Sequence, residues 1–383
     1  MQLCNINLVD VEGFRNIQVK SGLISIVAGD ESFPANLPGE TRISFKNAIA
    51  FPGLINSHDH LDFNLFPQTG NRIYHNYKEW STDIQVANKE LINSILKIDV
   101  ATRTRWGLYK NLINGITTVV NHGKKNAFAY NLVNVIQNNY SLHSLEFEKN
   151  WKLKLNRILT KDQPYVIHIG EGTDDASYEE IDRMVRWNLF RRKLIGVHGV
   201  AMDEKQAESF EALVWCPVSN YFLLGKTAAI DKLKTKTAIL FGTDSTLTAE
   251  WNLWEHLRLA RSTNLMSDRE LFEMLTTRPA AIWNLKNTGK IAENYVADIV
   301  IARRRGDSNN FNLFFSLNPE DILLVLCKGE IKLFDETLLE TLKTPDFNAT
   351  KFSKIIVAES CKYVQGNLPE PTSYVGFTSE QKN

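Results

Sequence analysis

The sequence predicts an α/β protein with a parallel sheet, flanked by a smaller β region from each end of the chain. Over residues 51–290, short apolar runs alternate with longer amphipathic stretches, which is the pattern of successive βα units. Residues 1–50 and 289–335 instead read as short strands. A chain of 383 residues is long enough for one large α/β barrel with an appendage.

The N-terminal region is expected to consist of short strands joined by turns. The segment LVDVEGFRNIQVKSGLISIVAG alternates apolar and polar residues, which places one face of each strand on a core. Gly13, Gly22 and Gly29 interrupt this alternation and mark the turns.

The central region contains six apolar runs that we expect to be buried parallel strands. They are GLINSH (53–58), ITTVVNH (116–122), YVIHIG (165–170), LIGVHG (194–199), LVWCP (213–217) and AILFGTD (238–244). Intervening stretches such as 176–192, 203–211 and 250–261 have helical spacing. The region therefore predicts alternating strands and helices.

The C-terminal region returns to strands. Residues 289–303 and 321–335 are expected to pair with the N-terminal strands in one small sheet domain. This divides the chain into a composite β domain (1–50 and 289–345), a barrel (51–288) and a C-terminal tail (346–383). Within the tail, KFSKIIVAES is expected to form a helix, and the residues after it are expected to be irregular.

Composition and charge exclude several classes of protein. Lys and Arg number 44 and Asp and Glu number 44, so the balanced charge argues against nucleic acid and polybasic membrane partners. No run reaches the roughly 18 apolar residues of a membrane span, and Asp10 and Glu12 lie where a signal peptide would be apolar. The scattered cysteines indicate neither a disulfide framework nor a cysteine-based zinc site. A cytoplasmic protein is expected.

Residues with acid-base or metal-binding chemistry stand at the ends of the apolar runs. His58 and His60 are two residues apart, so on a strand both rings point to one side. His168, His198 and Asp244 end three other runs, and Glu171 follows His168 closely. Each residue alone could be structural, and Glu171 or Asp244 could be a helix cap. Together, three histidines and an aspartate at converging strand ends indicate a metal site with nitrogen and oxygen ligands.

The motifs as a set resemble the amidohydrolase superfamily, in its mononuclear branch of cytosine, guanine and S-adenosylhomocysteine deaminases and triazine hydrolases. The resemblance covers roughly residues 1–340 and follows the order of the family's motifs. The matching segments are FPGLINSHDHL, NGITTVV, HIGE, GVHG, WCPVSNYFLLG, FGTDS and GKIAENYVADIVIA. The resemblance implies a distorted (β/α)8 TIM barrel with a small β-sandwich domain built from both chain ends.

The resemblance also implies a set of residue roles. The ligands of one divalent ion, zinc as the first expectation and iron as the second, would be His58, His60, His168 and Asp244. Glu171 would transfer a proton to the substrate, His198 would stabilise developing charge, and Asp244 would take the proton of the attacking water. One ion is expected because Lys124 and Lys125 come too early to be the bridging lysine of the binuclear branch.

Substrate contacts are assigned only as candidates. Trp80 lies in a loop that resembles the family's substrate loop, His122 ends the second central strand, and Asn220 belongs to the strand-seven turn. Trp80 could equally be loop packing, and Asn220 could shape the turn. The interval between His122 and His168 is short for two strands and two helices, so the barrel is expected to be trimmed there.

The function expected from these residues is hydrolytic deamination of a small, amino-substituted nitrogen heterocycle by a metal-activated water. The first alternative is hydrolysis of a cyclic amide, as in imidazolonepropionase-like relatives, without release of ammonia. The second is a barrel that binds a ligand without catalysis. A homodimer is the habit of the family, whereas the sequence itself does not indicate an oligomeric state.

Overall fold

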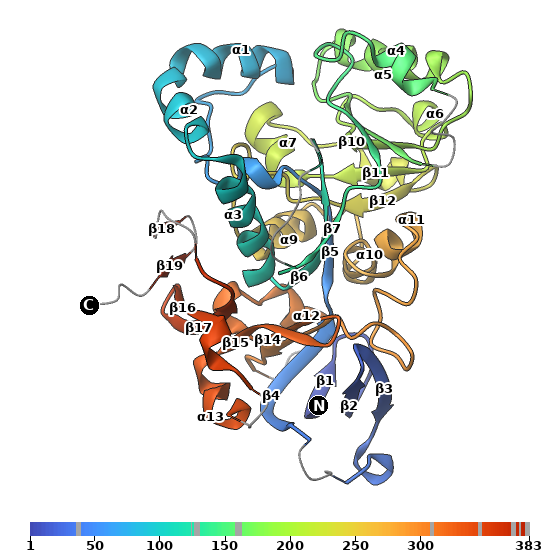
Figure 1. Ribbon diagram of the computed structural model, residues 1–383. Helices are drawn as coiled ribbons and strands as arrows, with labels where there is room; N and C mark the ends of the chain where they lie inside the picture. The colour runs from blue at the N-terminus through green and yellow to red at the C-terminus, as the bar shows by residue number, and fades with distance from the viewer. Residues whose placement is uncertain are drawn as a thin grey trace.

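The computed structural model describes residues 1–35, 40–123, 125, 131–157, 163–306, 310–343, 347–368, 373–374 and 377–379. Figure 1 shows two regions, with the α/β part above a sheet in which the blue N-terminal and red C-terminal segments lie side by side. None of the helices in the described part of the chain combines the length and apolarity needed to span a membrane.

The α/β part is a distorted barrel with eight strands among the described residues, arranged in two parallel sheets. These strands are β5 (Leu54–Asp59), β6 (Ile116–Asn121), β7 (Asn134–Ile136), β8 (Tyr140–Leu142), β9 (Tyr165–Ile169), β10 (Leu194–His198), β11 (Ala212–Trp215) and β12 (Ala238–Phe241). Parallel ladders join β5–β6–β7 and β8–β9–β10–β11–β12. Just beyond β12, the Asp244 N–H donates to the His58 carbonyl at 3.1 Å, so the last strand end meets the first. All six predicted strands are confirmed.

The barrel is trimmed between its third and fourth strands, as the short interval predicts. Residues 137–139 alone connect β7 to β8, so no helix separates these two strands. Both strands have only three residues, which explains why no apolar run marks them in the sequence.

Helices surround the strands and extend over their carboxyl ends. Their bounds are α1 (Tyr77–Ala87), α2 (Lys89–Leu96), α3 (Val100–Ile113), α4 (Trp151–Leu155), α5 (Asp175–Trp187), α6 (Glu204–Ala207), α7 (Pro217–Leu224), α8 (Ile230–Leu233), α9 (Leu253–Ser262), α10 (Asp268–Glu273) and α11 (Thr277–Ile282). Side-chain caps fix several starts; for example, Asp99 accepts the Thr102 N–H at the start of α3. Helices α1 and α2 belong to the connection after β5 and lie at the top of Figure 1.

Strands from both chain ends form one eleven-stranded sheet among the described residues, in the order β18-β19-β16-β17-β15-β14-β13-β4-β1-β2-β3. The strands are β1 (Gln2–Leu8), β2 (Phe14–Lys20), β3 (Leu23–Ala28), β4 (Arg42–Pro52), β13 (Ile299–Arg303), β14 (Ile322–Cys327), β15 (Glu330–Asp335), β16 (Phe352–Val357), β17 (Ser360–Gln365), β18 (Ser373–Tyr374) and β19 (Phe377–Ser379). Two short helices accompany them, α12 (Asn310–Phe315) and α13 (Leu339–Leu342). The antiparallel pairing of β4 with β13 joins the two chain ends, as predicted.

The helix expected in KFSKIIVAES is wrong, because this segment contains strand β16. Its β-branched residues Ile355, Ile356 and Val357 favour a strand, and Ile355 and Val357 are buried while Ile356 is exposed. The segment pairs with β17 and β19, so much of the expected tail belongs to the sheet. Phe377 packs on the Trp106 ring of α3, with ring centroids 4.9 Å apart, and so attaches the tail to the barrel.

The junction between the sheet and the barrel positions β5, the first strand of the barrel. Phe51 of β4 contacts Trp254 of α9 and Phe314 of α12 edge to face, with centroid distances of 5.9 and 5.1 Å. Gly53 then leads into β5, and a Cβ there would lie 2.1 Å from Thr117 Oγ1. Position 53 therefore requires glycine, and β5 begins at a tightly packed junction.

Candidate metal centre and active site

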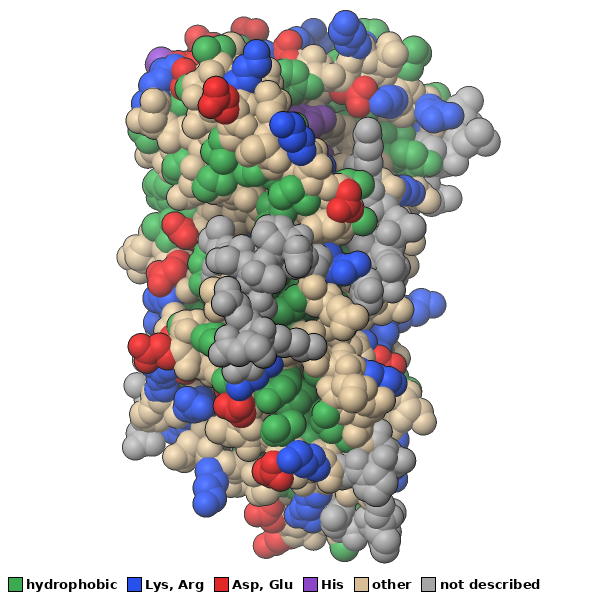
Figure 2. Space-filling model, turned by 60° about the vertical axis from the view of Figure 1, so that its left-hand side comes forward, with side chains coloured by type: hydrophobic (Ala, Val, Ile, Leu, Met, Phe, Trp, Pro, Cys, Tyr) green, Lys and Arg blue, Asp and Glu red, His purple; other side chains and the backbone are tan. Residues whose placement is uncertain are grey.

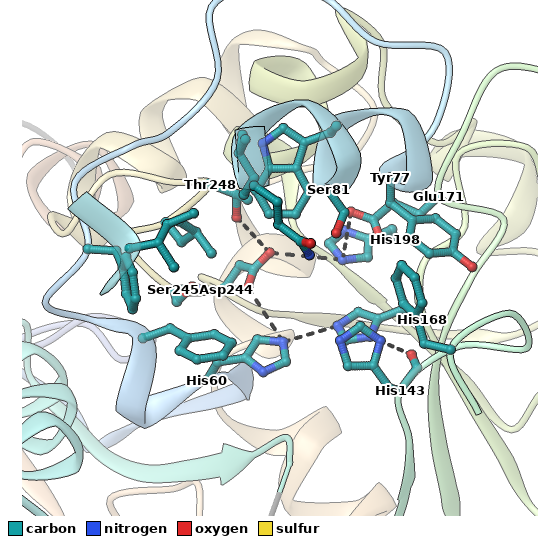
Figure 3. A pocket seen from close by; sticks show the side chains of 18 of the residues that line it. His60, Tyr77, Ser81, His143, His168, Glu171, His198, Asp244, Ser245 and Thr248 are labelled. Atoms are coloured by element: carbon teal, nitrogen blue, oxygen red, sulfur yellow. Dashed lines mark hydrogen bonds and ion pairs between the residues drawn. The ribbon is translucent and has the colours of Figure 1, made fainter. Parts of the chain in front are cut away.

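Four of the predicted site residues converge at the carboxyl ends of the barrel strands. His58 belongs to β5, His60 follows it, His168 belongs to β9 and Asp244 lies beyond β12. The Nε2 atom of His168 is 3.2 Å from Nε2 of both His58 and His60. Asp244 Oδ1 is 3.8 Å from His58 Nε2 and 4.0 Å from His60 Nε2. Figure 3 shows His60, His168 and Asp244 facing one another across this space.

The donor atoms fit a divalent cation. His168 Nδ1 is 2.7 Å from the His143 carbonyl, which only an Nδ1–H can satisfy, so in the neutral ring the lone pair is on Nε2. Burial, reinforced by neighbouring histidines, holds the pKa of His58 and of His168 well below the usual value, so both rings are neutral. Nitrogens around a tetrahedral zinc ion lie about 3.3 Å apart, which is close to the observed spacing.

The Asp244 carboxylate is held by hydrogen bonds on both oxygens. Oδ1 accepts the Ser245 N–H at 2.7 Å, and Oδ2 accepts the hydroxyls of Ser219 at 2.9 Å and Thr248 at 3.0 Å. Burial raises its pKa, but nearby His60 and His198 and these hydrogen bonds outweigh burial, so the pKa of Asp244 is below the usual value. The carboxylate is therefore ionised, as a metal ligand must be.

Glu171 and His198 lie beside this cluster and face the same space. The His198 Nε2 atom is 3.5 Å from Glu171 Oε1 and 3.9 Å from Asp244 Oδ2. Burial raises the pKa of Glu171 to about 7, an effect that His198 partly opposes. Near neutral pH the carboxyl group therefore exists in both forms, which suits a group that exchanges protons with a substrate.

Asn220 contacts His198 and does not reach the cavity. Asn220 Oδ1 accepts the His198 Nδ1–H at 2.9 Å, while its amide donates to Thr227 Oγ1 at 3.2 Å. The residue is 1% exposed and is absent from the described cavity wall. Asn220 therefore lies behind His198 and does not make the expected substrate contact, because it lies on the barrel-facing side of α7.

His122 also lies behind the candidate ligands. It is 3% exposed, its ring centroid is 4.3 Å from that of His168, and it is not among the described residues that line the cavity. Within the described chain, neither of its ring nitrogens has a hydrogen-bond partner. The structure therefore places His122 against the rings of His58, His60 and His168 instead of at the expected substrate position.

A cavity of about 360 Å³ opens onto the site. Trp80 lines it, as expected, and its Nε1–H donates to the Thr69 carbonyl at 2.7 Å, which fixes the plane of the ring. Much of the remaining wall is apolar; it includes Phe63, Phe66, Ile84, Ile92, Leu96, Phe147 and Leu247. Figure 2 shows a histidine side chain in a hollow in the upper half of the molecule.

Sequence reasoning missed several residues of the site. His143, whose carbonyl holds His168, also lines the cavity, and its position just after β8 is the only signal that could have identified it. Tyr77, Ser81 and Ile84 face the cavity from α1 at helical spacing. The Ser219 and Thr248 hydroxyls that hold Asp244 come from α7 and from the segment before α9.

Glu180 on α5 supports the turn between His168 and Glu171. The Oε1 atom of Glu180 accepts the N–H of Gly170, which has a φ of 59°, and burial raises the pKa of Glu180 to about 7.

Because this folded-state pKa of Glu180 exceeds the unfolded value of about 4.3, the carboxyl group contributes stability below about pH 4 that is lost as the pH rises through 7. In metal-free protein, Glu180→Gln should match the wild-type Tm near pH 4 and exceed it by a few degrees at pH 8.5. A Tm difference that does not change with pH would contradict this ionisation.

Comparison with known proteins confirms the resemblance predicted from the motifs. Residues 160–332 match the amidohydrolase family. The 5-methylthioadenosine/S-adenosylhomocysteine deaminase of Caldicellulosiruptor saccharolyticus is 22% identical over 391 residues, covering 85% of this chain and 90% of the relative. The enzyme of the same name from Carboxydothermus hydrogenoformans is 23% identical, covering 76% and 82%.

Solved structures share the fold. A zinc-bound adenosine deaminase from Xanthomonas campestris has a TM-score of 0.65 at 15% identity, covering 91% of this chain and 96% of its own. A zinc-complexed atrazine chlorohydrolase from Arthrobacter aurescens TC1 has a TM-score of 0.66 at 16% identity, covering 86% and 94%. A guanine-bound guanine deaminase from C. acetobutylicum has a TM-score of 0.59 at 16% identity, covering 86% and 99%. These similarities confirm the predicted barrel fold.

Proposed function

We propose that this amidohydrolase-like chain is a metal-dependent aminohydrolase that deaminates an amino-substituted nitrogen heterocycle. The observation that carries the proposal is the position of Glu171, 3.5 Å from His198 and open to the same cavity as the candidate metal ligands. A carboxyl group of raised pKa beside the neutral rings of His58 and His168 is an arrangement suited to hydrolysis with proton transfer. The deaminase names of the curated relatives support the same reaction.

The proposed ion ligands are His58, His60, His168 and Asp244, with one ion per chain and zinc as the first choice over iron. Such an ion, when bound, supplies an activated water at neutral pH. Asp244 would accept the proton of that water, and His198, whose Nε2 lies 3.9 Å from Asp244 Oδ2, would stabilise the charge that develops beside it. Glu171 transfers protons to the substrate: a proton on a ring nitrogen makes the attacked carbon more electrophilic, and a proton on the amino nitrogen lets it leave as ammonia.

The cavity supports a heterocyclic substrate with an apolar substituent. Trp80 offers a flat ring held in a fixed plane, which suits packing on a planar heterocycle. Ile84, Ile92 and Leu96 of α1 and α2 form an apolar wall for a substituent. A cytoplasmic location and the lack of a nucleic acid partner stay predictions from the sequence, and a homodimer stays an expectation from the family resemblance.

The reaction is tested by measuring ammonia release from zinc-loaded protein over aminopurines, aminopyrimidines, pterins and aminotriazines. The proposal predicts stoichiometric ammonia and the corresponding oxo product from at least one of these classes. A second assay follows the ultraviolet absorbance of cyclic amides without an amino group. Turnover of cyclic amides without ammonia from any amine would contradict deamination and favour ring opening.

A further inference from the structure

A buried ion pair lies directly behind the proposed metal site. Asp59 of β5 is 0% exposed and Lys110 of α3 is 5% exposed, and the distance from Lys110 Nζ to Asp59 Oδ2 is 3.2 Å. Neither residue lines the cavity among the described residues, so neither is placed to touch a substrate. Removing two charges from water is unfavourable, so a buried pair is weak evidence for a contribution to stability alone.

Asp59 connects this pair to two of the proposed ligands. It stands between His58 and His60 on a strand, where alternation turns its side chain away from theirs. Its Oδ2 accepts the Asn111 amide at 2.7 Å and its Oδ1 accepts the Asn64 amide at 2.9 Å. The strand end that carries both histidines is thereby anchored to α3 and to the turn after β5.

Lys110 connects the pair to the fourth proposed ligand. Its ammonium donates to the Asp244 carbonyl at 2.7 Å, to Asn64 Oδ1 at 2.9 Å and to Thr243 Oγ1 at 3.2 Å. Asp244 has a φ of 58°, in the left-handed region that few non-glycine residues adopt. Its N–H donates to the His58 carbonyl, so one side of this residue's backbone is held by β5 and the other by Lys110.

We propose that Lys110 is a positioning residue that sets Asp244 at its distance from His58 and His60. One ammonium spans the end of β5, through Asp59, and the end of β12, through the Asp244 carbonyl. It stabilises the left-handed backbone that turns the Asp244 carboxylate toward the histidines. The inference rests on the metal site proposed above and adds a residue that touches neither the ion nor the substrate.

The test is a pair of matched double variants titrated with Co²⁺ after removal of other metals. Lys110→Met with Asp59→Asn removes both charges, so no buried charge is left unpaired. The control is Lys362→Met with Asp335→Asn, because Lys362 is also a buried lysine, with Nζ 3.1 Å from Asp335 Oδ2 and two backbone carbonyls as acceptors. Equilibrium dialysis gives the affinity, the visible absorption of bound Co²⁺ reports ligand geometry, and Tm reports stability.

The inference predicts that the Lys110→Met, Asp59→Asn double variant (the 59/110 variant) binds Co²⁺ about 10–100-fold more weakly than the wild type, with shifted absorption bands. The control pair should lower Tm while leaving affinity and bands unchanged. Thr243→Val gives a second test, since it removes the hydroxyl that donates to the Asp244 carbonyl at 3.0 Å and accepts from Lys110 Nζ at 3.2 Å, and it should shift the bands in the same direction. If the double variant does not fold, the Co²⁺ affinity and absorption bands of Thr243→Val test the inference instead.

Three results would overturn the inference, and they differ in what else they affect. Wild-type affinity and bands in the 59/110 variant, or in Thr243→Val if that is the variant that folds, would make the pair merely structural and leave the proposed function intact. Failure of wild-type protein to take up Co²⁺ would overturn both the inference and the proposed metal site. Equal loss of affinity in the control pair would attribute the effect to general destabilisation and would also reject a specific role for Lys110.

Discussion

Replacing Glu171 with glutamine is expected to lower kcat/KM for deamination by about 10²–10⁴-fold while leaving the metal content unchanged. Glutamine keeps the shape of the side chain but cannot exchange a proton. The described residues contain two groups whose atoms could hold a metal ion, His58 with His60 and His168, and His58 with His198 and Asp244. Glu171 belongs to neither group, so its loss removes no proposed ligand. The measurement is kcat/KM together with elemental analysis of the same preparation.

The dependence of kcat/KM on pH gives a second test of the role of Glu171. Because burial raises the pKa of Glu171 to about 7, the protonated form is lost as the pH rises, and wild-type kcat/KM should fall above about pH 7. The variant should lack this limb. Glu179→Gln, which removes an exposed carboxylate from α5, the helix that follows Glu171, is the matched control. Normal turnover by Glu171→Gln would rule out the proton-transfer role.

Replacing Asp244 with alanine is expected to weaken metal retention and to lower turnover by at least about 10³-fold. The variant removes the oxygen donor that faces His58 and His60, and with it the group that takes the proton of the water. Ser219 and Thr248 lose their shared acceptor, but their hydroxyls lie 3.0 Å apart and can bond to each other. The fold should therefore persist, which circular dichroism checks.

Metal analysis separates Asp244 from a purely structural acidic residue. Asp231→Ala on α8 removes an exposed carboxylate as the control and should change neither metal content nor rate. Full metal content in Asp244→Ala would remove Asp244 from the ligand set. Full activity in that variant would contradict its role in accepting a proton.

Residues at strand ends could be predicted from the sequence because strand periodicity is local. His58 of β5 and His60 just after it face the same site, as the spacing predicts, and parallel strands bring His168 and Asp244 to the same end of the barrel. The pairing of β4 with β13 follows in the same way from two clear strand patterns.

Other features depend on tertiary contacts that a single sequence does not encode locally. Strands β7 and β8 are too short for an apolar run, so His143 had no visible strand beside it. The direction of Asn220 depends on the rotation of α7, and the burial of Lys110 depends on Asp59 and Asp244 from distant segments. In the tail, β16 forms because β17 and β19 pair with it, which outweighs the helical interpretation of KFSKIIVAES.

The count of bound metal ions per chain tests the central claim most directly. Elemental analysis of freshly purified protein, repeated after chelation and reloading with zinc, needs no knowledge of the substrate. The site built from His58, His60, His168 and Asp244 predicts about one zinc or iron ion per chain. Two ions per chain would reveal an additional ligand and redirect the search to cyclic amides and esters. No ion, even after reloading, would contradict a metal-dependent hydrolase.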